Sequence, residues 1–135
     1  MKRRRQGFVM AWVLFVLGVV LALAQARGDR MVSEAQLVRR QAMRAQALAV
    51  AEGAIEESRY RLESGGNAAV QLDLGDRRAT CETVRASGPG RVALLARGVA
   101  GPGQWGVQVR VELRVEAGAS GPRTVVESWS EQPLP

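Results

Sequence analysis

The feature that most constrains this chain is an uncharged apolar run near its N-terminus. Residues 8–26 contain no charged residue and no proline. As a helix, this run would rise about 28 Å at ~1.5 Å per residue, which is close to the ~30 Å hydrocarbon core of a bilayer. No later apolar run is long enough to cross a membrane. The sequence therefore predicts a single membrane-spanning helix over residues 8–26.

Positive charge is concentrated just before this run. The chain has 19 Lys and Arg residues against 13 Asp and Glu residues, a net charge of +6. The first four basic residues are Lys2, Arg3, Arg4 and Arg5. A basic flank keeps its end of a spanning helix on the cytoplasmic side. We therefore interpret the cluster as an orientation signal and not as a nucleic-acid contact. Without residues 1–7 the counts are 15 and 13, a net charge of +2.

Two interpretations of the N-terminus follow from the residues alone. The first is a secretory signal peptide cut after Ala26, since Ala24 and Ala26 supply the small residues of a cleavage site. It would release a secreted or periplasmic binding module, although the run exceeds the usual apolar length of about 7–15 residues. The second is a permanent single-pass anchor of an accessory protein.

A third interpretation rests on a resemblance. The basic start, Gly7, Phe8 and the following apolar helix resemble the N-terminus of the type IV pilin and type II secretion pseudopilin family. The resemblance implies that a prepilin peptidase cuts between Gly7 and Phe8 and methylates the new amine. It implies an inner-membrane subunit with its C-terminal part periplasmic or extracellular, which later joins a cell-surface fibre. It also implies that one apolar surface packs on other subunits, formed by Trp12, Val13, Leu14, Val16, Leu17, Val20 and Leu21.

One residue departs from the family pattern. Major pilins carry a glutamate as the fifth residue of the mature chain, where it is thought to pair with the N-terminal amine of a neighbour. Here that residue is Trp12, whose indole carries no negative charge. The resemblance therefore implies a minor subunit used in initiation or at the tip. Whether the system serves a pilus, secretion or DNA uptake stays open.

Residues 27–64 predict an amphipathic helix, because strong helix formers dominate and proline is absent. One stripe of mostly small and apolar residues recurs at spacings of three and four, and is expected to pack on a sheet: Val38, Ala45, Leu48, Ala51, Ile55, Ser58 and Leu62. Gly65 and Gly66 predict the helix end. A capping box at Ser33 and Gln36 leaves open a break between Ala26 and Ser33.

Residues 67–131 change period and predict an antiparallel sheet. Apolar residues alternate with charged ones from Trp105 to Glu116, as in a strand with one buried face. Shorter strands are expected at 69–74, 80–86, 91–96 and 124–130, separated by Gly- and Pro-rich turns. We expect an α+β fold with the helix on the sheet and a frayed tail at 132–135. Trp105 and Trp129 are expected to be buried anchors of the sheet, with exposure at a partner surface as the alternative.

The composition argues against most enzyme classes. The chain has no histidine and one cysteine, Cys81. Zinc sites built on His and Cys, histidine-based triads and intrachain disulfides are therefore excluded. We expect no metal and no cofactor, and we interpret Cys81 as a small buried residue in a strand, with an intermolecular disulfide as the alternative.

Overall fold

The computed structural model describes residues 2–102 and 105–134, with side chains described from Val9 onward. These residues form one helix and five strands: α1 (Lys2–Glu63), β1 (Val70–Asp73), β2 (Arg77–Val84), β3 (Arg91–Ala100), β4 (Trp105–Gly118) and β5 (Gly121–Pro133). The chain divides into two compact units, one up to Arg39 and one from Arg40 onward.

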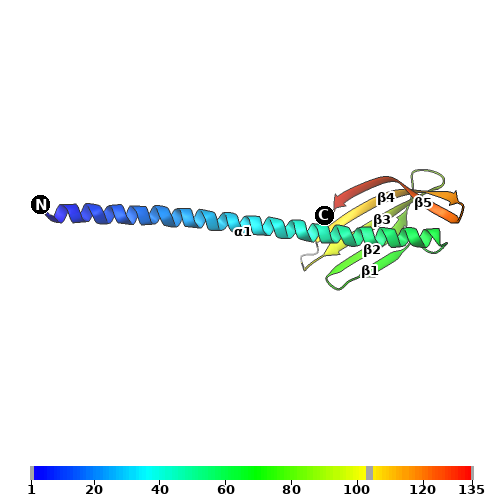
Figure 1. The fold of residues 1–135 in the computed structure, drawn as a ribbon, viewed down its shortest axis with the longest axis horizontal. Helices are drawn as coiled ribbons and strands as arrows, with labels where there is room; N and C mark the ends of the chain where they lie inside the picture. The colour runs from blue at the N-terminus through cyan, green and yellow to red at the C-terminus, as the bar shows by residue number, and fades with distance from the viewer. Residues whose placement is uncertain (1, 103–104, 135) are drawn as a thin grey trace. The chain divides into compact units, whose positions relative to one another are not determined.

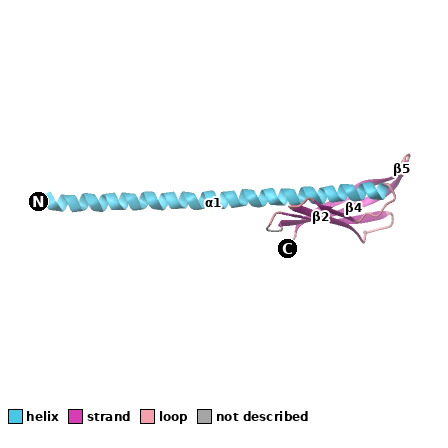
Figure 2. Cartoon of the chain, turned by 90° about the horizontal axis from the view of Figure 1, so that it is seen from below, coloured by secondary structure: helices cyan, strands magenta, loops and turns pink. Residues whose placement is uncertain are grey.

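The second unit has two layers. Its strands pair in sequence order, β1-β2-β3-β4-β5, in one antiparallel sheet. The part of α1 that belongs to this unit crosses one face of the sheet (Figure 1), and a view turned by 90° shows helix and strands as separate layers (Figure 2). The predicted α+β fold, a long N-terminal helix packed on a small antiparallel sheet, is confirmed.

Helix α1 shows no break at the position where the sequence left one open. It continues through Gly28 and Ser33. The Ser33 hydroxyl donates to the carbonyl oxygen of Arg30 at 2.8 Å, one turn earlier, so it does not begin a new helix as a capping residue. The predicted stop is confirmed: Gly65 has φ +76°, and Gly66 N–H donates to Arg61 O at 2.7 Å, as in a Schellman motif.

The core lies between α1 and one face of the sheet. On β4, Val107, Val109, Val111 and Leu113 are all buried, which places the apolar half of the predicted alternation against the helix. On α1, the buried positions follow a three- and four-residue spacing: Ala47, Val50, Ala51, Ala54, Ile55 and Ser58. The helix therefore packs on the sheet mainly through small side chains.

The C-terminal residues are more ordered than the sequence predicted. Strand β5 continues to Pro133, and Leu134 N–H donates to Gly106 O at 3.0 Å. The guanidinium of Arg44 in α1 forms an ion pair with the carboxylate of Glu131, with 3.0 Å between Nη2 and Oε1. The expectation of a frayed tail is therefore wrong for residues 132–134, because the end of β5 is held by β4; residue 135 lies outside the described residues.

Strand β5 contains a bulge that changes which side chains face α1. Its pairing with β4 shifts between Glu112 and Leu113, so that Ser128 and Val126 oppose these two residues and Glu127 is the extra residue. A bulge reverses the alternation of side chains beyond it. Thr124 and Val126 therefore share the helix-facing side with Trp129 and Glu131, which strict alternation would place on the other side.

Candidate functional site

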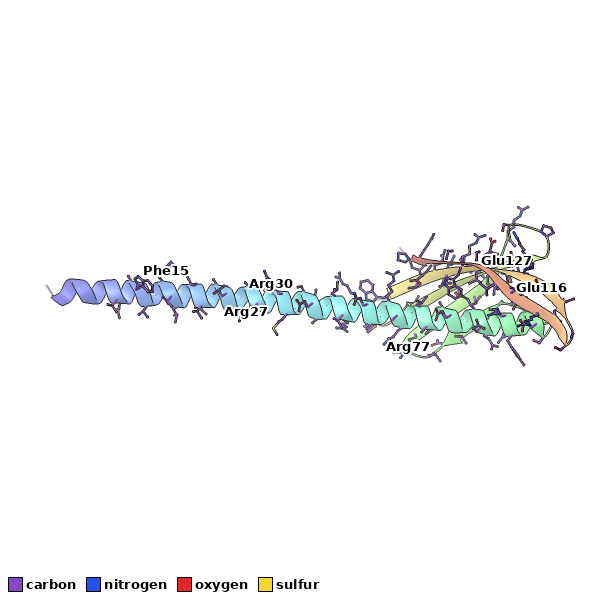
Figure 3. The ribbon with its side chains drawn as sticks, turned by 45° about the horizontal axis from the view of Figure 1, so that its top comes forward. Phe15, Arg27, Arg30, Arg77, Glu116 and Glu127 are labelled. Atoms are coloured by element: carbon purple, nitrogen blue, oxygen red, sulfur yellow. The ribbon has the colours of Figure 1, made fainter. Side chains whose placement is uncertain are left out.

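The apolar part of α1 is exposed on all sides. Every described side chain from Val9 to Ala26 is solvent-accessible, and the most apolar window of α1 has a mean hydropathy of 2.4. Figure 3 shows side chains leaving the helix both above and below in the stretch around Phe15. A helix that is apolar all round needs a bilayer or other protein surfaces to cover it. This segment is long and apolar enough to span a membrane.

The residues that the resemblance assigned to subunit packing lie in this exposed segment. Trp12 is 60% exposed, and the other six are exposed as well: Val13, Leu14, Val16, Leu17, Val20 and Leu21. Trp12 lies on one open apolar surface with Val9, Val13, Val16, Leu17 and Val20. The seven residues of the predicted packing surface do not all lie on this face, because positions 12–14 alone point in three directions around a helix.

The residues expected to direct processing and orientation lie where the structure describes no side chains. Gly7 and Phe8 are the predicted cleavage pair, and Lys2, Arg3, Arg4 and Arg5 are the predicted orientation signal. Their backbone belongs to α1, but their side chains fall outside the described residues. Both assignments remain predictions.

The surface of α1 that meets the sheet differs in part from the predicted stripe. Ala51 and Ile55 lie in the core, and Leu48 and Leu62 pack against it half-buried. Ala45 is exposed, and Val38 is 63% exposed and lies in the first unit, so both assignments to helix–sheet packing are wrong. The sequence analysis missed three buried residues of the observed surface: Ala47, Val50 and Ala54.

The closest approach of the two layers is at Gly98 of β3. A Cβ atom at this position would overlap the carbonyl oxygen of Ala47 and lie 3.0 Å from the Cβ of Ala51. Only glycine fits there, and only small side chains fit opposite it on α1. This contact explains why alanines, and not larger residues, form the centre of the helix face.

Both tryptophans of the sheet are more exposed than expected. Trp105 and Trp129 are each 44% exposed, so the prediction that they are buried anchors is wrong. Trp105 begins β4 and lies under the guanidinium of Arg40, 5.7 Å from the ring centroid. Trp129 lies on the edge strand β5, and no further strand among the described residues pairs with its outer side.

The charged residues of β4 form ion pairs on the face of the sheet away from α1. Arg114 pairs with Glu116 at 3.0 Å and with Glu127 at 3.5 Å, while Arg91 pairs with the same Glu127 at 2.7 Å. Arg91 and Arg114 are direct cross-strand neighbours, so the bulge residue Glu127 offsets their mutual repulsion. Glu127 and Glu116 are labelled in Figure 3. This pairing is that of a solvated, charged face of a sheet.

The end of α1 holds the beginning of the edge strand. Glu63 accepts hydrogen bonds from the Thr124 hydroxyl at 2.7 Å and from Thr124 N–H at 2.9 Å. Arg59 donates to Thr124 Oγ1 at 3.2 Å and to its carbonyl oxygen at 3.4 Å. The hydrogen bonds from Thr124 lower the pKa of the Glu63 carboxyl, the one from its hydroxyl most strongly.

Cys81 of β2 is buried in the core, as a small strand residue would be. Burial raises the pKa of its thiol, which disfavours the reactive thiolate. In the folded chain this thiol is not placed for an intermolecular disulfide. Within the described residues, no group of three Cys, Asp or Glu side chains is arranged to hold a metal ion.

Comparison with known proteins gives no relative: no protein-family model, no curated protein and no solved structure matches this chain.

Proposed function

We propose that this chain is a minor pilin or pseudopilin, a structural subunit that begins or caps a type IV pilus or a type II secretion-like fibre. The observation that carries the proposal is the combination of a Gly7-Phe8 pair after a basic start with a helix that stays fully exposed from Val9 to Ala26. A cut at this pair would leave the whole apolar segment on the mature chain.

An apolar segment that stays on the mature chain would occupy two successive environments. It lies first in the inner membrane, where lipid covers all of its sides. It then moves into the fibre, where helices of other subunits replace the lipid. The exchange is feasible because lipid tails and an apolar helix core are similarly nonpolar. Exposure around the whole circumference supports this role, since neither environment covers only one face.

The second unit supplies a folded head for such a subunit. Its core is closed by α1 and the sheet, because the apolar core residues that the structure describes lie between Ala47 and Leu113. The head therefore keeps its fold whether the apolar segment lies in lipid or among other helices. The same property would let it stand exposed at a fibre end.

Trp12 supports a position at the end of a fibre and not along its shaft. A subunit within the shaft has a neighbour whose charged amine must be offset inside an apolar core, where an unpaired charge is costly. The indole of Trp12 offers no carboxylate for this. A subunit at the end has no such neighbour on one side and needs no acidic partner there.

Processing by a prepilin peptidase tests the proposal. The full chain would be co-expressed with such a peptidase and followed by electrophoretic mobility in membrane fractions. We expect a shortened, membrane-bound product from the wild type and none from Gly7→Leu. The matched control, Ala26→Leu, blocks a signal-peptidase site and should leave processing intact. Loss of processing in Ala26→Leu, with Gly7→Leu still processed, would overturn the proposal in favour of a secreted protein.

A further inference from the structure

Once residues 1–26 are set aside, the remaining charge of the chain is unevenly distributed. Residues 27–44 hold five arginines and two acidic residues, a net charge of +3. Residues 45–135 hold ten arginines and eleven acidic residues, a net charge of −1. Outside residues 1–26, the basic surplus therefore lies entirely in the helical segment that follows the apolar run.

The arginines of this segment differ in their contacts. Arg44 pairs with Glu131, and Arg40 lies over the ring of Trp105. Arg27 and Arg30 are exposed and, within the described part of the chain, have no carboxylate within ion-pair distance. Both guanidiniums are thus free to bind an anion.

The positions of Arg27 and Arg30 on α1 place them together at one end of the apolar run (Figure 3). They are three residues apart, so they lie on the same side of the helix about 4.5 Å apart along its axis. Arg27 follows directly after the last residue of the run. In a helix that spans a bilayer, this is the depth of the lipid headgroups.

We propose that Arg27 and Arg30 bind the phosphate groups of anionic phospholipids in the outer leaflet of the membrane. The inference rests on the membrane-spanning helix of the proposed function and adds the lipid class that this helix selects. A guanidinium matches the geometry of a phosphate with two hydrogen bonds, and arginines beside a membrane are attracted to anionic lipid. The pair fixes the depth of the helix after the basic residues before Gly7 have been removed.

The pair does not conflict with the predicted orientation. Four basic residues precede the run in the full chain, against two directly after it, and Asp29 lies between these two. The larger cluster determines the cytoplasmic side during insertion. After processing, Arg27 and Arg30 are the first basic side chains that the mature chain carries.

Lipid selectivity of the full chain tests this inference. The chain would be reconstituted in phosphatidylcholine vesicles with trace spin-labelled phosphatidylglycerol or spin-labelled phosphatidylcholine, and electron paramagnetic resonance would give the immobilised fraction of each. We expect the wild type to prefer phosphatidylglycerol. Arg27→Gln/Arg30→Gln should lower that preference at least about twofold, since each arginine near the surface contributes to it. The leader residues are identical in both proteins, so they do not account for the difference.

Arg39→Gln is the matched control. Arg39 is also exposed and without an ion pair among the described residues, but it lies about 18 Å further along α1 than Arg27, beyond the ~8 Å screening length. It should leave the preference unchanged. A loss as large as that of the double variant would overturn the assignment to Arg27 and Arg30.

Two further results separate the possible failures. Inorganic phosphate should reduce the preference no more than sodium chloride of equal ionic strength; a stronger effect would mean a site for free phosphate and would overturn the lipid assignment. Carbonate extraction reports insertion separately. An inserted wild type without lipid preference contradicts only this inference, whereas a chain removed by carbonate contradicts the membrane-spanning helix and this inference together.

Discussion

Gly98 of β3 lies directly against the carbonyl oxygen of Ala47 in α1, so that the two layers of the head touch backbone to backbone. A Cβ atom on residue 98 would overlap this oxygen. Backbone atoms of a helix cannot turn aside as the end of a flexible side chain can. The contact therefore fixes the distance between helix and sheet.

Replacing Gly98 should destabilise the head more than a single methyl group normally does. We expect Gly98→Ala to lower the free energy of unfolding by about 3 kcal/mol, at the upper end of the range for overpacked cores, because α1 must move away from β3. Urea unfolding of the full chain in mild detergent, followed by far-ultraviolet circular dichroism, measures the change.

Gly53→Ala is the control for this variant. Gly53 lies in α1 facing β1, and its nearest neighbour for an added Cβ is Leu72 Cδ1 at 3.8 Å, an ordinary contact. Alanine should therefore stabilise the helix by about 0.5–1 kcal/mol. Equal stability of Gly98→Ala and the wild type would contradict the close packing described above.

The hydrogen bonds between Glu63 and Thr124 predict a pH dependence. They hold the pKa of Glu63 below its ordinary value of 4.5. A carboxyl whose pKa is lowered by folding adds stability above its unfolded pKa, and this contribution is lost as the pH falls through the folded pKa. The urea concentration at the unfolding midpoint of the wild type should therefore decrease as the pH is lowered below about 4.5, and Glu63→Gln should show a smaller decrease.

Variants of Thr124 identify the source of this dependence. Thr124→Ser keeps both the hydroxyl and the backbone donor, so it should keep the drop. Thr124→Val loses the hydroxyl, which lowers the pKa of Glu63 most, and should reduce the drop. Glu112, whose pKa is lowered mainly by the hydroxyl of Ser87, maintains part of the dependence in every variant. An unchanged drop in Glu63→Gln would show that this carboxyl is not involved.

Cys81 should be protected from thiol reagents in the folded chain. Burial both blocks access to its sulfur and raises the pKa of the thiol. We expect modification by a soluble disulfide reagent to proceed only as the head unfolds, with a rate that rises with urea. The sequence has no other cysteine, so the signal comes from this site alone. Rapid labelling of the native chain would contradict the packing of β2 in the core.

The helix face that packs on the sheet was only partly predictable from the sequence. Alanines occur at positions 42, 45, 47, 49, 51 and 54, on several sides of the helix. A stripe of small residues can therefore be drawn through Ala45 or through Ala47 with similar spacing. The choice depends on Gly98, which lies far away in the chain and whose approach selects Ala47. By contrast, β4 was predictable because its alternation from Val107 to Leu113 allows only one buried face.

The exposure of Trp129 follows from the position of β5 at the edge of the sheet, which the sequence does not mark. The bulge at Glu127 shifts the alternation of β5 and turns Trp129 to the helix-facing side, but at the sheet edge this side chain stays 44% exposed. The strand itself was expected from its residues, and so was the helix stop at Gly65. The cleavage pair and the basic cluster rest on the sequence pattern and stay predictions.

Replacing Trp12 tests why this subunit would stand at a fibre end. If the missing carboxylate keeps it out of the shaft, Trp12→Glu should raise its share in sheared fibres relative to the wild type. Immunogold labelling along the fibres, together with quantitative blotting of the sheared fraction, measures this share. The physical reason is a charge pair between the new carboxylate and the amine of a neighbour.

Ala11→Glu is the control, because it adds the same charge one residue away from the fifth mature position. It should lower the amount of chain in fibres, since an unpaired carboxylate in an apolar surrounding is costly. Equal incorporation of the two variants would mean that position 12 has no special role.

If the proposed function is right, the chain keeps its apolar helix and begins at Phe8 after processing. Intact-mass spectrometry of the protein extracted from membranes of its native host, with sequencing of the N-terminal peptide, measures this directly. We expect a mature chain that begins at Phe8 and whose N-terminal amine carries one methyl group. A mature chain that begins at Arg27, or one that retains residues 1–7, would contradict this expectation.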